Sequence, residues 1–176
     1  MENTKSTWGN RFIIAAIIQG GIITALALTI VGIQVTFTQI NIMQFLSLSF
    51  EGPAKWFFLG TIFYLILVVA IAVSAVFYIH LEINLNKTFS GAMRTLPWIH
   101  IIGMNVGGTG ATMLMIFVGL AGSGVLSVFS EGKLGRENIA IIDSFVTPIG
   151  LFIGVLAIGV ICGGIGFILA YKKTRS

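Results

Sequence analysis

WIHIIGMNVGGTGATMLMIFVGLAGSG, residues 98–124, contains no Asp, Glu, Lys or Arg and has seven glycines. About 20 consecutive apolar residues are enough to cross the hydrocarbon core of a bilayer as a helix. Glycine weakens a helix in water, but in lipid small residues let neighbouring helix backbones approach closely. The stretch therefore predicts a transmembrane helix whose glycines pack against other helices.

Three more stretches have the same apolar character, and together with this one they span about 12–37, 56–79, 98–126 and 145–171. The chain has 176 residues, of which 56% are hydrophobic and only 9% are charged. A soluble domain carries about 25% charged residues. We therefore predict an all-α membrane protein, in which residues 1–176 form a single membrane domain built as a four-transmembrane-helix bundle.

The connection between the first two predicted spans is amphipathic. Asn41, Gln44 and Ser47 recur at a spacing of three among apolar residues, which is typical of a helix lying in the membrane interface. We expect such a helix over about 40–50, ended by Gly52 and Pro53.

Basic residues are distributed unevenly between the loops. Seven of the ten lie in the segments that an even number of spans places on one side: Lys5, Arg11, Lys87, Arg94, Lys172, Lys173 and Arg175. Because positive charge is retained inside the cell, both termini are predicted to be cytoplasmic in a multi-pass protein of the cytoplasmic membrane. The net charge of +4 indicates contact with anionic lipid headgroups, and with no basic run longer than two residues we expect no nucleic-acid binding.

Pairs of glycines four residues apart occur in the last two predicted spans. They are Gly103 and Gly107, Gly150 and Gly154, and Gly159 and Gly163. Such pairs favour close helix contact, either within one chain or between chains. We predict that these six residues are the helix-packing sites.

Three polar residues, Asn105, Thr109 and Thr112, lie on one face of the third predicted span. Each polar group in hydrocarbon needs a hydrogen-bonding partner, so this stripe should face protein. Hydrogen bonding between helices is the favoured interpretation. The alternatives are a small-molecule or quinone pocket, or the lining of a path through a small homo-oligomeric channel or lipid-binding module.

The two histidines, His80 and His100, end the second predicted span and begin the third. They lie near the same membrane face on neighbouring helices, as two axial ligands of a b-type haem must. The other interpretation places both among the interfacial aromatic residues. We predict no metal site and no catalytic residue, because the predicted spans hold no carboxylate and no nucleophile–base pair can be assembled.

The segment 76–124 resembles the C-terminal helices of the haem–copper oxidase large subunit. The residues that carry the resemblance are Asn86, Thr88, Ile99, His100, Gly103, Asn105 and Gly119-Leu120-Ala121-Gly122. The chain departs from that family because no histidine pair precedes His80 in the second predicted span. The resemblance therefore implies a truncated, non-catalytic relative or a companion subunit.

These observations favour a non-catalytic integral membrane subunit that serves as a structural or accessory component of a larger membrane complex, with a respiratory or redox complex as the narrower expectation. One alternative is a b-type haem electron-transfer protein that uses His80 and His100. The other is the small homo-oligomeric channel or lipid-binding module. We expect its partners to be the lipid bilayer and either other membrane subunits or further copies of the chain.

Overall fold

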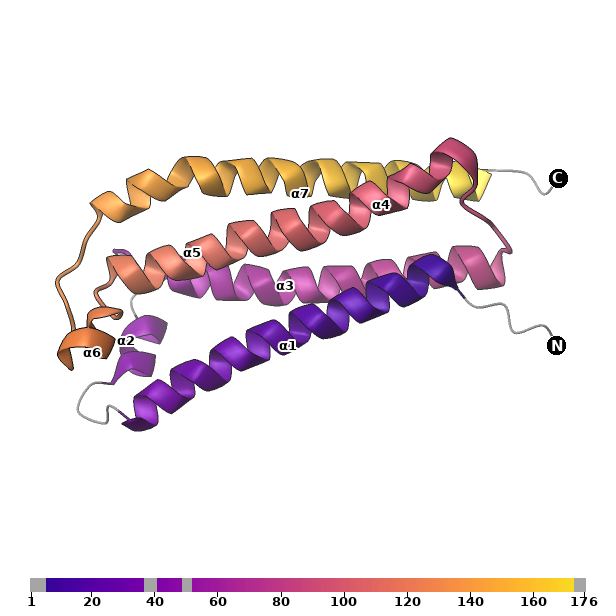
Figure 1. The fold of residues 1–176 in the computed structure, drawn as a ribbon. Helices are drawn as coiled ribbons and strands as arrows, with labels where there is room; N and C mark the ends of the chain where they lie inside the picture. The colour runs from indigo at the N-terminus through magenta and orange to yellow at the C-terminus, as the bar shows by residue number, and fades with distance from the viewer. Residues whose placement is uncertain (1–5, 37–40, 49–51, 173–176) are drawn as a thin grey trace.

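The computed structural model describes residues 6–36, 41–48 and 52–172, and four long apolar helices dominate it (Figure 1). These are α1 (Thr7–Thr36), α3 (Ala54–Ile79) extended by η1 (His80–Asn84), a broken third span, and α7 (Ala140–Lys172). The third span consists of η2 (Gly91–Arg94), α4 (Thr95–Ile102), η3 (Gly103–Gly108) and α5 (Thr109–Gly122). All four are long and apolar enough to cross a membrane, which confirms the prediction of an all-α, four-helix membrane protein.

The third span lies at the centre of the bundle, between α3 and α7, while α1 packs on α3 (Figure 1). In its most apolar window 56% of the residues are buried, compared with 11% in α1 and 17% in α7. The two outer helices therefore leave most of their apolar side chains on the surface of the chain.

Glycine makes the third span narrow enough to contact the α7 backbone. A Cβ atom added to Gly103 would lie 2.5 Å from Gly159 Cα, and one added to Gly107 would lie 2.4 Å from Leu156 N. Real Cβ atoms do not approach other atoms so closely, so no larger residue fits without a shift of the backbone. These two predicted packing sites meet α7 within the chain.

Glycine also brings the third span against α3. A Cβ atom on Gly119 would lie 2.1 Å from Phe57 N, and one on Gly60 of α3 would lie 2.8 Å from Ile116 N. Gly108 lies against the side chain of Leu67. The backbone of the third span therefore contacts the backbones of both α3 and α7.

Two helical segments have the wider π-type turn, η1 and η3. In η1, Leu85 N donates to His80 O, five residues earlier, at 3.1 Å. An extra residue in a turn changes which faces the following residues present. In η3, the adjacent residues Gly107 and Gly108 lie against different neighbours, α7 and α3 respectively.

The third span ends earlier than its apolar run predicts. It stops at Gly122, and Gly124 adopts φ +78°, a left-handed conformation that glycine reaches without strain. Gly124 N donates to Ala121 O, and Gly124 O accepts from Gly135 N at 3.0 Å. The turn joins α5 to the short helix α6 (Ser127–Glu131).

The connection between α1 and α3 contains the helix α2 (Ile42–Leu48), inside the stretch where an interfacial helix is expected. Ile42 and Leu46 are buried in one cluster with Val125, which precedes α6, and Val128, which lies in α6. Residues 37–40 and 49–51 lie outside the described residues. The helix thus packs on one end of the bundle; its depth in the membrane stays a prediction.

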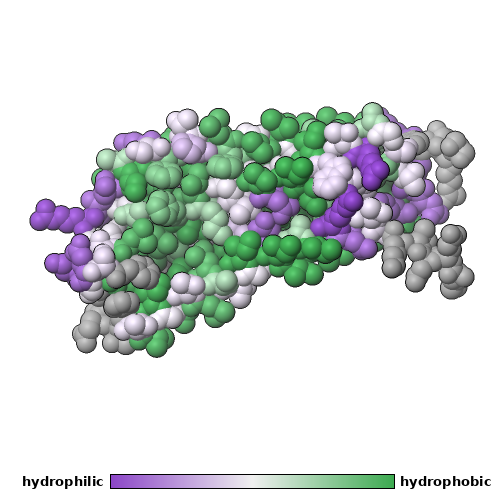
Figure 2. Space-filling view, in the orientation of Figure 1, coloured by the Kyte–Doolittle hydropathy of each residue, from purple (hydrophilic) through white to green (hydrophobic). Residues whose placement is uncertain are grey.

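The start of α1 and the end of α7 lie at one end of the bundle, which we call the terminal end (Figure 1). On the face shown in Figure 2, hydrophobic residues cover most of the middle and hydrophilic residues gather at the ends. Arg11 lies near the start of α1, and Lys172 ends α7. Lys87 and Arg94 lie in the connection from η1 to α4, which is at the same end (Figure 1). Lys5, Lys173 and Arg175 lie outside the described residues, and the membrane side that this end faces stays a prediction.

Replacing Gly107 by leucine should destabilise the bundle, because the atoms that its side chain meets belong to the α7 backbone. We expect the free energy of unfolding to fall by about 1–3 kcal/mol, the usual effect of overpacking a filled core. Unfolding in mild detergent measures this change. Gly21→Leu is the matched control, since a Cβ at Gly21 has nothing within 4 Å. Equal stability of the two variants would contradict the assigned contact.

Candidate functional site

A polar cluster in the middle of the spans joins three helices. The Tyr64 hydroxyl of α3 donates to Gln19 Oε1 of α1, and Gln19 Nε2 donates to Asn105 Oδ1 of η3 at 2.9 Å. Asn105 Nδ2 donates to Ile101 O at 2.8 Å. Tyr64 is completely buried and Gln19 nearly so. The cluster ties α1 to the third span at a depth where water is not available to replace these bonds.

The three residues of the predicted polar stripe have different surroundings. Asn105 bonds to Gln19, as described, whereas Thr112 Oγ1 donates to Gly108 O of its own helix at 2.8 Å. Thr109 lies between these two residues in the sequence, and its hydroxyl oxygen is buried. The stripe therefore faces protein, and Asn105 bonds to a side chain of another helix.

Sequence analysis did not identify Gln19 and Tyr64 as members of this cluster. Both are polar residues well inside apolar runs, and a polar side chain in hydrocarbon requires a partner. This requirement indicates that Gln19 and Tyr64 each bond to another polar group. The sequence does not specify the pairing, because it depends on how the helices are rotated about their axes.

His100 lies in a second cluster, to which all four spans contribute. Its ring is buried, and its Nδ1 is 3.2 Å from the Tyr78 hydroxyl of α3. Phe12 of α1 lies 5.0 Å from the imidazole, and Phe167 of α7 lies 5.9 Å from it, between ring centroids. A Cβ on Gly163 would lie 2.5 Å from the imidazole, so this predicted packing glycine contacts a ring and not a backbone.

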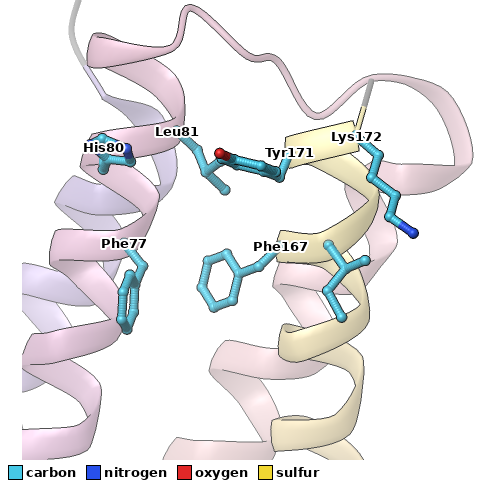
Figure 3. Close-up of a pocket in the computed structure, with 7 residues that line it drawn as sticks. Phe77, His80, Leu81, Phe167, Tyr171 and Lys172 are labelled. Atoms are coloured by element: carbon cyan, nitrogen blue, oxygen red, sulfur yellow. The ribbon is translucent and has the colours of Figure 1, made fainter. Parts of the chain in front are cut away.

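His80 has different surroundings. It is exposed, and Asn84 Nδ2 lies 3.0 Å from its Nδ1. It lines a pocket between α3 and α7 whose other walls include Phe77, Phe167 and Tyr171 (Figure 3). Figure 3 shows the Tyr171 ring reaching from α7 toward α3 and Lys172 extending away from the pocket.

The structure does not bring the two histidines to one cavity. The pocket beside His80 is not lined by His100, which is enclosed by the aromatic cluster. Among residues 6–36, 41–48 and 52–172, no group of three or more His, Cys, Asp or Glu side chains is placed to hold a metal ion. Haem ligation by His80 and His100 stays a prediction. The pocket at His80 does not include His100, so it does not offer both ligands to one haem.

The remaining predicted packing residues, Gly150 and Gly154, lie on the exposed face of α7. A Cβ atom on either would have no atom of the described chain within 4 Å. They therefore differ from Gly103, Gly107 and Gly159, which meet backbone inside the bundle.

At the terminal end, the Glu82 carboxylate of η1 caps α1. It accepts from the Ser6 hydroxyl, from Trp8 N at 3.0 Å and from Gly9 N at 3.4 Å. A negative charge at a helix N-terminus is favourable because the first N–H groups have no partner within the helix. Sequence analysis missed this residue, because nothing in the sequence links a carboxylate just after the second predicted span to a helix start 74 residues earlier.

Comparison of the chain with protein-family models, with curated proteins and with solved structures gives no match. The resemblance of segment 76–124 to the haem–copper oxidase large subunit therefore stays a prediction.

The polar cluster should stabilise the bundle through coupled hydrogen bonds. In a double-mutant cycle of Tyr64→Phe and Gln19→Leu, we expect a coupling energy of about 0.6 kcal/mol, up to about 1.7, as for other hydrogen bonds between membrane helices. Unfolding in a denaturing detergent measures it. Tyr171→Phe, which removes the hydroxyl of an exposed tyrosine, is the control and should leave stability unchanged. Zero coupling would show that the bond between Tyr64 and Gln19 does not form.

Proposed function

We propose that the chain is a non-catalytic integral membrane subunit, a structural or accessory component of a larger membrane complex. More narrowly, we propose that this complex is a respiratory or other redox complex. The observation that carries it is a row of small residues on the outer face of α7. This row consists of Gly150, Gly154, Ala157 and Gly164, and we call it the outer seam.

The outer seam has the geometry of a helix-docking surface. All four residues are exposed, and its three glycines have no atom of the described chain within 4 Å of an added Cβ. Their spacings of four, three and seven place them along one side of a helix. A neighbouring helix can therefore approach the α7 backbone closely at Gly150, Gly154 and Ala157. Beyond them, the exposed side chain of Ile161 lies on the same side, before Gly164.

The position of these glycines requires an explanation, because glycine in a helix interior costs about 0.5–1 kcal/mol relative to alanine. Inside the bundle that cost is offset by close contact at Gly103, Gly107 and Gly159. At the outer seam nothing in the described chain offsets it, and the same is true of Gly21 in α1. The outer seam differs from Gly21 because its small residues follow one another along one side of the helix. A helix from another polypeptide supplies the missing contact.

The polar groups of the spans support a structural role over a channel. Gln19, Tyr64 and Asn105 bond to one another between helices, and Thr112 bonds to its own helix. These side chains hold the helices together instead of presenting a continuous polar path. The geometry thus favours the subunit proposal over the homo-oligomeric channel.

Gly154→Leu should release the chain from its complex without destabilising the chain itself. We expect the variant, purified from native membranes in mild detergent, to lose its partner polypeptides while its unfolding temperature stays that of the wild type. Gly21→Leu, the same change at another open glycine, should retain the partners.

Three results of this experiment distinguish the proposals. Loss of an unlike polypeptide supports the subunit function. Loss of a second copy of this chain alone supports the homo-oligomer instead. Migration of the wild-type protein as a lone monomer contradicts both.

A further inference from the structure

A second feature of the terminal end concerns Arg11, in the second turn of α1. Its guanidinium carbon lies 4.6 Å from the ring centroid of Trp8 and 4.5 Å from that of Trp98. The two indole rings are nearly perpendicular, with centroids 5.3 Å apart. Arginine held against aromatic rings loses little further side-chain freedom when it binds an anion. The guanidinium is therefore preorganised.

The charge of Arg11 is not neutralised by the described chain in this arrangement. Its Nη1 atom is buried and has no hydrogen-bond partner among the described residues. The carboxylate of Glu82 instead receives Ser6 and the first N–H groups of α1. Arginine does not lose its proton in proteins, and a partly buried charge without a partner is unfavourable. An anion in the adjacent groove, which Arg11 borders, offsets the charge of the guanidinium.

An apolar groove begins at Arg11 and runs between α1 and the third span. Its walls are mostly apolar, formed by Ile14, Ala15, Ile18, Ile101, Ile102 and Val106. Asn105 also lines the groove, with its amide already bonded to Gln19 and to Ile101 O. At about 1.5 Å per residue, Ile18 lies roughly 10 Å further along the α1 axis than Arg11. The groove thus has a cationic mouth at the terminal end and apolar walls toward the middle of the bundle.

We propose that this groove binds an anionic phospholipid, whose phosphate pairs with Arg11 and whose acyl chain lies along the apolar walls. The order of groups in such a lipid matches the order along the groove: a negative headgroup at the membrane boundary and a hydrocarbon chain below it. Arginine recognises phosphate through two parallel hydrogen bonds. Trp8 and Trp98 lie near the starts of α1 and α4, and indole rings are favoured at the headgroup level of a membrane.

The test measures lipid retention by native mass spectrometry of the full-length protein, titrated with phosphatidylglycerol and separately with phosphatidylcholine. We expect one phosphatidylglycerol to bind more tightly than phosphatidylcholine. Arg11→Gln should weaken phosphatidylglycerol binding about tenfold or more, the effect of losing a charge-assisted hydrogen bond. Arg94→Gln removes an exposed cation elsewhere in the third span and should bind as the wild type does.

A second variant keeps the proposal testable if Arg11→Gln does not fold. Ile18→Trp fills the groove but leaves the Arg11 cluster in place, and it should also weaken phosphatidylglycerol binding. Equal binding by the wild type and both variants would overturn the proposal. Displacement of the lipid by millimolar inorganic phosphate would overturn it as well, because the site would then recognise the phosphate alone.

Discussion

Backbone contact through glycine is the constraint on which the rest of the structure depends. The third span lies between α3 and α7, and the distances at Gly103, Gly107 and Gly119 leave no room for a side chain. In lipid, the burial of apolar surface contributes little to helix association, because lipid tails are also apolar. Dispersion attraction between closely packed backbones stabilises the bundle instead. Because the third span contacts both neighbours in this way, the positions of α3 and α7 are fixed through it.

The side-chain clusters add α1 to this arrangement. Gln19 bonds to Tyr64 and Asn105 in the middle of the spans, Phe12 packs on Tyr78 and His100 nearer the terminal end, and Glu82 receives the first N–H groups of α1. Hydrogen bonds and aromatic packing thus hold α1 against the bundle, whereas backbone contact at glycine holds α7. The outer faces of both helices remain apolar and exposed, one as the outer seam and one beside the groove at Arg11.

Much of the fold was predictable because composition and span length dictate it: an apolar run of this length has to form a helix in lipid. The glycine spacing treats Gly103, Gly107 and Gly159, which lie against the backbone of a neighbouring helix, in the same way as Gly150 and Gly154, which do not. That difference depends on the rotation of α7, which its nearly uniform apolar sequence does not encode. The pairing of Gln19 with Asn105 and the cap by Glu82 were missed for a related reason, since each joins residues far apart in the chain.

The central claim is that α7 uses one face inside the bundle and the opposite face, the outer seam, to meet another polypeptide. Photo-crosslinking in native membranes, with a benzophenone amino acid at Ala157, tests it most directly. Our account predicts a covalent adduct with another membrane polypeptide, and only lipid adducts when the same group replaces Ile17 on the exposed face of α1. Lipid adducts alone from position 157 would contradict the account.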